Sequence, residues 1–179
     1  AGTYWYHPHN KTYEQLARGL YGAFIVEEAK PPAVDQDRVL IVDDWRHNAN
    51  DAIDARSFDS THDITHAGRL GNGLTPNGKA QEDIHVQAGG RLRLRLINAS
   101  NARIMGVIFE GHAPVVVALD GFPANAPFVP KRNMVFLAPA QRADVLLDCT
   151  GDVGTTANIV VDVGREKLTL GRLVYHERK

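Results

Sequence analysis

"RLRLRLIN" (Arg91–Asn98) alternates leucine and arginine without a break. Alternation with a period of two residues is typical of a β-strand that has one apolar face. The pattern places Leu92, Leu94 and Leu96 together on that face, and it places Arg91, Arg93 and Arg95 on the other. We expect the arginine face to be solvated or to form interdomain ion pairs, in preference to binding an anion.

Further strands are expected on both sides of this one, separated by turn signals at Asp120-Gly121, Pro139, Gly151 and Gly164. The long polar stretch 46–80 is rich in glycine and asparagine, so we expect mostly loop there. Short strands with almost no helix predict an all-β chain that forms an antiparallel sandwich or barrel. The strand candidates are "RVLIVDDW", "ARIMGVIFEG", "PVVVALDG", "NMVFLAP", "RADVLLD", "TANIVVDVG" and "LGRLVYHE".

Composition narrows the functional classes. With 179 residues, 44% of them hydrophobic, the chain can bury one ordinary core. The net charge of −1, from 20 basic and 21 acidic residues, argues against a nucleic-acid binder or a basic membrane anchor, and no apolar run could span a bilayer. Cys149 is the single cysteine, so an intrachain disulfide is excluded.

The first 30 residues resemble the end of an incomplete domain. They contain two strand candidates, Gly2–Tyr6 and Tyr21–Val26, around one or two helical turns that begin at Thr12 as N-cap and end at Gly19. Two strands cannot form an independent core. We therefore divide the chain into an incomplete domain end (1–30), a proline-containing linker (31–37) and a β-domain (38–179). The two strands could pack on the β-domain, be disordered, or pair with another copy in a homo-oligomer.

The segment "GTYWYHPH" (Gly2–His9) ends in two histidines separated by one proline. In an extended chain His7 and His9 project to the same side, with Cα atoms about 6.5–7 Å apart. This separation is too large for comfortable chelation of one ion, but it suits two neighbouring ions that each receive one imidazole. Pro8 cannot donate to a strand ladder, so the pair belongs at a strand edge or end. The alternative to a metal site is a buried aromatic strand that happens to end in histidine.

Other histidines are weaker candidates. His62 and His66 are four residues apart and would share one face of a helix, but their polar, glycine-rich surroundings favour a solvated loop. His47 is expected in a loop, His85 and His112 at strand edges or turns, and His176 in a frayed end. Arg142 and Asp144 in "QRADV" are expected to fix a turn by hydrogen bonding.

Three stretches together resemble one known family. "GTYWYHPHNKTYEQLARGLYGAFIVEE" resembles the second His-x-His motif of multicopper oxidases, the group of laccases and cuprous oxidases. "GGRLRLRLINASNAR" and "VVALDGFPANAPFVPKRNMVFLAPAQRADVLLD" resemble segments of their second domain, with Ala140 in place of the usual glycine. The resemblance covers most of the chain and is weakest over 46–78.

The resemblance implies a cupredoxin-like Greek-key β-sandwich and a copper-dependent oxidoreductase. Such an enzyme oxidises phenols, metal ions or similar donors one electron at a time at a type 1 copper, and it reduces O2 to water at a trinuclear cluster. It implies that His7 and His9 each bind one copper of the type 3 pair. The first His-x-His motif and the third-domain motifs have no match here, and Cys149 has no neighbouring histidine, so it does not resemble a type 1 ligand.

We therefore expect a fragment that ends domain 1 and includes a copper-free domain 2, inactive alone, whose partners are the missing domain 1 and domain 3 segments of the parent. Family resemblance implies a periplasmic or extracellular parent. No signal peptide is visible, and a start on Ala1 suggests a trimmed or truncated product. Two alternatives stay open: a non-enzymatic β-sandwich module for interaction or assembly and, ranked last, a small metallohydrolase that uses His7, His9 and Glu14 or Asp44.

Overall fold

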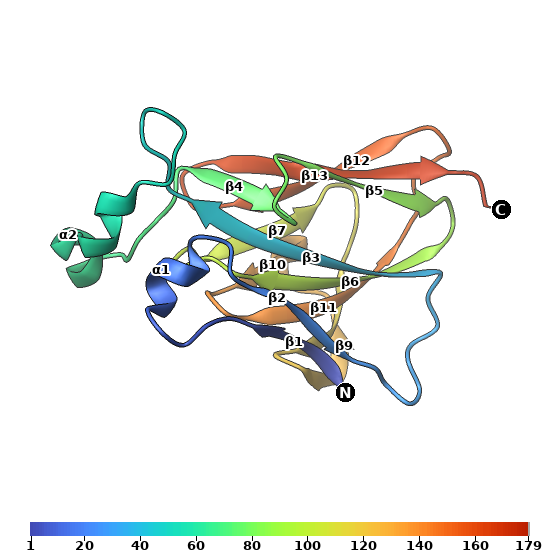
Figure 1. Cartoon of the computed structure of the whole chain (residues 1–179). Helices are drawn as coiled ribbons and strands as arrows, with labels where there is room; N and C mark the ends of the chain where they lie inside the picture. The colour runs from blue at the N-terminus through green and yellow to red at the C-terminus, as the bar shows by residue number, and fades with distance from the viewer. Residues whose placement is uncertain (179) are drawn as a thin grey trace.

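Two β-sheets stacked face to face make up most of the computed structural model, which describes residues 1–178 (Figure 1). The six-stranded sheet has the order β4 (Gly73–Pro76), β3 (Gln36–Trp45), β6 (Arg91–Asn98), β11 (Arg142–Asp148), β8 (Val115–Leu119) and β9 (Phe122–Phe128). The five-stranded sheet has the order β10 (Met134–Leu137), β7 (Met105–Phe109), β12 (Thr156–Asp162), β13 (Lys167–His176) and β5 (Glu82–Gln87). This arrangement confirms the expected all-β, cupredoxin-like sandwich.

Most neighbouring strands are antiparallel, but two pairs are parallel: β3 with β6, and β5 with β13. Three strands were not expected from the sequence: β4, β5 and β9. β9 contains Pro123 and Pro127 and lies at a sheet edge, where proline is tolerated because the missing N–H has no ladder partner to lose. β3 begins at Gln36, two residues before the expected strand.

The core lies between the two sheets. Leu92, Leu94 and Leu96 are fully buried in it, as their alternation predicted, and they meet residues of the facing sheet such as Val107 and Leu173. Each such side chain contributes roughly 1.5–3 kcal/mol on burial. The apolar face of β6 therefore supports the fold of the sandwich.

The arginine face of β6 is buried as well. Arg93 is 1% exposed and Arg95 5% exposed, because a two-stranded ribbon, β1 (Gly2–Tyr6) with β2 (Gly22–Val26), lies against that side of the sheet (Figure 1). Of the three alternatives for the N-terminal strands, the structure shows packing on the β-sandwich. Arg93 and Arg95 are not solvated but form ion pairs, Arg93 with Glu28 and Asp144 and Arg95 with Asp37.

The helices are short: α1 (Thr12–Leu16), η1 (Ala55–Asp59), α2 (Thr61–Thr65) and η2 (Lys131–Asn133). One expectation was wrong in detail. Lys11, in a left-handed conformation, occupies the N-cap of α1, while the Thr12 hydroxyl donates to the Pro8 carbonyl. The stretch 46–80 is mostly loop, as expected, and it also contains η1, α2 and β4. Among residues 1–178, no helix is long and apolar enough to cross a membrane.

Candidate metal centre

The β1–β2 ribbon positions the His-Pro-His segment. The two strands pair from Gly2 with Val26 to Tyr6 with Gly22, so the ladder ends one residue before His7. The Tyr6 ring lies directly over Gly22, and a Cβ at position 22 would force that ring to move. The histidines therefore leave the end of a paired strand in a defined direction.

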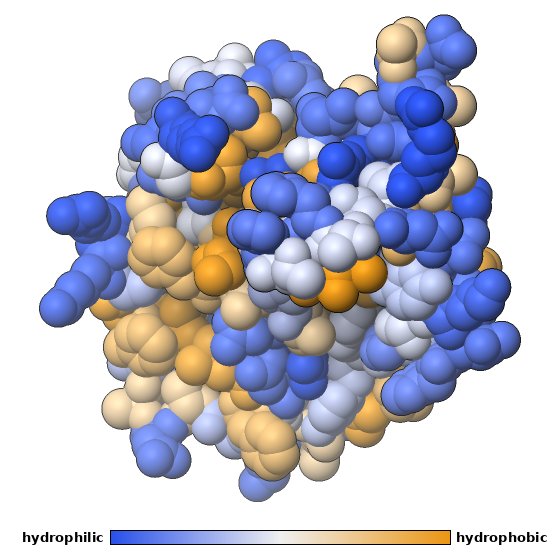
Figure 2. All heavy atoms as spheres, turned by 90° about the vertical axis from the view of Figure 1, so that its left-hand side faces the viewer, coloured by the Kyte–Doolittle hydropathy of each residue, from blue (hydrophilic) through white to orange (hydrophobic). Residues whose placement is uncertain are grey.

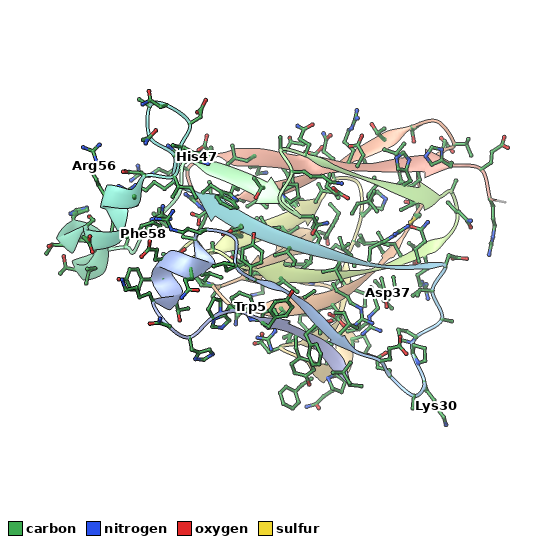
Figure 3. The ribbon with its side chains drawn as sticks, viewed as in Figure 1. Trp5, Lys30, Asp37, His47, Arg56 and Phe58 are labelled. Atoms are coloured by element: carbon green, nitrogen blue, oxygen red, sulfur yellow. The ribbon has the colours of Figure 1, made fainter. Side chains whose placement is uncertain are left out.

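The two imidazoles lie parallel. The ring centroids of His7 and His9 are 5.0 Å apart with an interplanar angle of 11°. The ring of Trp5, which Figure 3 labels, packs on His7 with the centroids 4.6 Å apart. His7 Nδ1 lies 3.2 Å from the Pro8 carbonyl oxygen. A carbonyl oxygen can only accept, so this contact requires a proton on Nδ1 and leaves the Nε2 lone pair of His7 free for a metal.

This donor set fits copper, because neutral imidazole is a ligand that copper prefers. It forms only part of a coordination shell. Among the described residues, no group of three or more histidine, cysteine, aspartate or glutamate side chains is placed to hold a metal. Two further carboxylates that the sequence offered are engaged elsewhere: Glu14 pairs with Arg18, and Asp44 pairs with Arg103.

A buried hydrogen-bond network anchors β1 to the sandwich. The Thr3 hydroxyl donates to Asp144 Oδ1 at 2.6 Å and accepts from Arg95 Nη1 at 2.9 Å. Asp144, on β11, also accepts from Arg93 Nη2 at 2.6 Å. It was expected to fix a turn, and instead it joins the ribbon to the arginine face of β6.

The same end of the ribbon is held a second time, through the chain that follows β2. Glu28 binds Arg93 through two hydrogen bonds of 2.8 and 2.7 Å, and Asp37 binds Arg95 through two bonds of 2.7 Å. The hydrogen bond from Arg93 holds the pKa of Glu28 below its ordinary value. Figure 3 shows the connection between β2 and β3, with Lys30 at its outer tip and Asp37 back at the sheet. Both ends of this connection are therefore fixed to β6.

A turn of the sandwich that contains a glycine also contacts the β1–β2 ribbon. The turn Asp120-Gly121 lies under β1, with Gly121 at φ +85°, and a Cβ on Gly121 would lie 2.7 Å from the Tyr4 ring. Arg142 holds this turn as expected: its backbone N–H donates to Asp120 Oδ1 at 2.9 Å, and its Nη2 donates to the Asp120 carbonyl at 3.1 Å.

The segment after α1 reaches β3 through a buried carboxyl. Asp43 lies beside Tyr21 and Asp44, and burial, reinforced by the Asp44 carboxylate, raises the pKa of Asp43 to about 7. Burial and the Asp43 charge also raise the pKa of Tyr21. Asp43 therefore binds its proton up to a higher pH than an exposed aspartate does.

Helix α1 also packs on the 46–72 segment. The ring of Phe58 in η1, labelled in Figure 3, contacts two guanidinium groups. Arg18 lies 5.2 Å and Arg69 4.5 Å from the ring centroid, and the Tyr13 ring is 6.4 Å away. Asn101 Nδ2 donates to the Tyr13 carbonyl at 2.7 Å. The helix that follows the two histidines is thus held by the 46–72 segment and by Asn101.

Within residues 1–178, the remaining histidines form no metal-ligating group with His7 and His9. His47 and His62 line a separate cavity of about 370 Å³, whose Asp63 is bound to Arg46. His112, in a turn, lies 2.5 Å from the buried hydroxyl of Tyr175. His176 was expected in a frayed end, which was wrong, because it is the last residue of β13. Cys149 is buried, and burial raises the pKa of its thiol to about 11.

Sequence reasoning missed the residues that hold the ribbon, Thr3, Glu28 and Asp144. The available signal was the arginine stripe on β6. Two buried arginines on one strand require carboxylate partners, and Asp144 lies on the neighbouring strand.

The sequence matches two models of the multicopper oxidase family, over residues 1–31 and 36–175. The iron transport multicopper oxidase fetC of Epichloe festucae is 29% identical over 96% of this chain and 27% of its own length. Laccase-1 of Thanatephorus cucumeris is 35% identical over 67% of this chain and 23% of its own length.

Solved structures give the same result. A multi-copper oxidase from Pseudomonas thermotolerans superposes with a TM-score of 0.87 at 28% identity, covering 99% of this chain and 41% of that one. Lac15, from a marine microbial metagenome, superposes with a TM-score of 0.76 at 37% identity, covering 100% and 43%. The chain spans about a quarter of the length of the curated relatives named above. With a family model matched over most of its residues, this chain belongs to the multicopper oxidase family.

Proposed function

We propose that this chain is part of a copper-dependent oxidase in which His7 and His9 each bind one copper ion of the type 3 pair. The observation that carries the proposal is the pair of parallel imidazoles, 5.0 Å apart, at the end of a ribbon anchored by buried charges. Because His7 Nδ1 faces the Pro8 carbonyl, Nε2 is the nitrogen offered to metal. Trp5 packs on the His7 ring and restricts its rotation.

The remaining copper ligands would come from segments outside these 179 residues. Large apolar side chains that stay exposed in the β1–α1–β2 segment support this view. Four large side chains of the β1–α1–β2 segment are about half exposed or more, namely Tyr6, Tyr13, Leu20 and Phe24. Seen from the end of the molecule that carries α1 and α2, apolar side chains also gather below a mainly hydrophilic upper part (Figure 2). Such surface fits a domain that is completed by more chain.

In the complete protein, bound copper would supply one-electron oxidation of phenols, metal ions or similar donors and the reduction of O2 to water. This chain would contribute two ligands and the copper-free second domain that positions them, and it would not turn over alone. The complete protein would act in the periplasm or outside the cell. An assembly of several copies remains compatible with the apolar surface.

The test compares the chain with the variant His7→Ala/His9→Ala. After Cu²⁺ is added below one equivalent, the paramagnetic ion should broaden the amide NMR signals of residues 5–11 in the unmodified chain and leave them sharp in the variant. Unchanged broadening would favour the alternative, a non-enzymatic β-sandwich module with adventitious metal.

Turnover supplies the second measurement. The copper-loaded 179-residue chain should not sustain oxidation of a phenolic dye, whereas the complete protein should, and there His7→Ala or His9→Ala should abolish it. Sustained turnover by the isolated chain would contradict the proposal.

A further inference from the structure

We propose that His85 and His176 form a second metal site, open to solvent, that binds one divalent transition-metal ion such as Cu²⁺ or Zn²⁺. It lies on the outer face of the five-stranded sheet and uses neither His7 nor His9. The inference therefore stands or falls separately from the proposed function.

The strands place the two side chains on the same surface. β5 and β13 are parallel neighbours, with His85 paired to Val174 and Gln87 paired to His176. Leu173 and Tyr175 point into the core, so Val174 and His176 point outward. His85 faces outward for the same reason, between the buried Ile84 and Val86. Each histidine is thus fixed by a paired strand rather than by a loop.

The ring nitrogens converge. His85 Nδ1 and His176 Nε2 are 2.5 Å apart, and the ring centroids are 4.8 Å apart with an interplanar angle of 28°. Two neutral imidazoles cannot turn lone pairs toward each other, so without a cation one nitrogen must donate a proton to the other. A metal ion accepts both lone pairs at once. Because Zn–N bonds are about 2.0–2.1 Å long, the two rings would rotate slightly outward to admit the ion.

The neighbouring charges permit a cation. In the next row of the same face, Arg172 donates to both carboxylate oxygens of Asp83, at 3.1 and 2.6 Å. The guanidinium is therefore neutralised and directed at Asp83. Gln87, the register partner of His176, brings a side-chain amide to the same face, and the exposed position lets water complete the coordination.

A second histidine pair provides a matched control. His62 and His66 stack at 4.2 Å, but His66 Nδ1 lies 3.0 Å from the His62 carbonyl and 2.9 Å from the Thr65 hydroxyl. That nitrogen is already hydrogen-bonded, and α2 is a helix of only five residues. The pair resembles the proposed site in composition and exposure, but no ring nitrogens of the pair meet in a comparable way.

The experiment uses the full chain carrying His7→Ala/His9→Ala, titrated with Cu²⁺ and followed by amide NMR signals. Broadening should appear first in residues 83–87 and 172–176. Adding His85→Gln/His176→Gln should remove it and weaken Zn²⁺ binding, measured by calorimetry, at least tenfold. Adding His62→Gln/His66→Gln should change neither.

His7 is half-buried and the other histidines to be changed are exposed, so the variants should fold, and unchanged amide shifts outside the two strands would confirm that. Broadening or Zn²⁺ affinity that survives His85→Gln/His176→Gln would overturn the proposal, as would broadening centred on residues 61–66.

Discussion

Arg93 and Asp144 form an ion pair that solvent does not reach, with Nη2 2.6 Å from Oδ2 and side chains 2% and 1% exposed. Glu28, from the segment after β2, binds the same guanidinium from the other side. Burial disfavours the charged guanidinium, but the hydrogen bonds that it donates to Glu28 and Asp144 outweigh this effect and raise the pKa of Arg93. The ribbon that bears the His-Pro-His segment is thus attached through a charge inside the protein.

Replacing Asp144 with alanine should destabilise the chain by about 3–5 kcal/mol, because two buried guanidinium groups, Arg93 and Arg95, would lose the carboxylate between them. Urea unfolding measures the change. Asp148→Ala is the control, since Asp148 pairs with Arg91 at an exposed position on the same two strands. Equal losses of unfolding free energy in the two variants would show that burial does not strengthen the ion pairs of Asp144.

Replacing Thr3 with valine keeps the shape of the side chain but removes one donor to Asp144 and one acceptor for Arg95. We expect a loss of about 1–3 kcal/mol, concentrated in the ribbon. Hydrogen exchange should therefore accelerate in β1 and β2 more than in β12 and β13. Thr12→Val, at the start of α1, is the control and should leave the exchange of β1 unchanged. Uniform acceleration throughout the sandwich would argue against local anchoring.

The stability of the chain should depend on the protonation of Asp43. Its folded pKa of about 7 lies above the ordinary value of 3.8, so the folded state retains a proton that the unfolded state releases. This contribution is complete below about pH 4 and is lost as the pH rises to about 7. Relative to Asp43→Asn, the unmodified chain should lose on the order of 2–4 kcal/mol between about pH 4 and pH 8.

Unfolding free energies measured at several pH values check this dependence. Asp51→Asn, in an exposed loop, should leave the pH dependence as it is. A difference between the unmodified chain and Asp43→Asn that stays constant with pH would show that Asp43 ionises normally in the folded chain.

Gly121→Ala should disturb the contact between the ribbon and the turn below it. Gly154 has almost the same backbone conformation, φ +83° against +85°, but a Cβ there meets nothing within 4 Å. Gly154→Ala should therefore cost about 1 kcal/mol from backbone strain alone. Gly121→Ala should cost about 1–3 kcal/mol more, because its methyl group meets the Tyr4 ring. Equal costs would mean that Tyr4 moves aside freely.

The fold could be predicted from the sequence where apolar and polar residues alternate. β6 is the clearest case, because its leucine face was expected and is buried. β9 was missed because its two prolines oppose a strand in general but not at a sheet edge. β5 was missed because four of its six residues are polar and it lies directly after the polar stretch.

The candidate site was predictable in part. The direction of His7 and His9 follows from the two-residue repeat of an extended chain, and a single strand contains all the information that this requires. The anchoring of that strand depends on Thr3 and Asp144, 141 residues apart. No local pattern reports such a contact, and the arginine stripe indicated only that partners were needed.

The seam between ribbon and sandwich also has a geometric consequence. Apolar surfaces can slide past each other with little change in energy, whereas directed bonds to Thr3 and Glu28 are satisfied in one alignment only. A shift of the ribbon by one residue would reverse its faces and leave buried arginines without partners. The polar contacts between ribbon and sandwich therefore set the position of the two imidazoles relative to the six-stranded sheet.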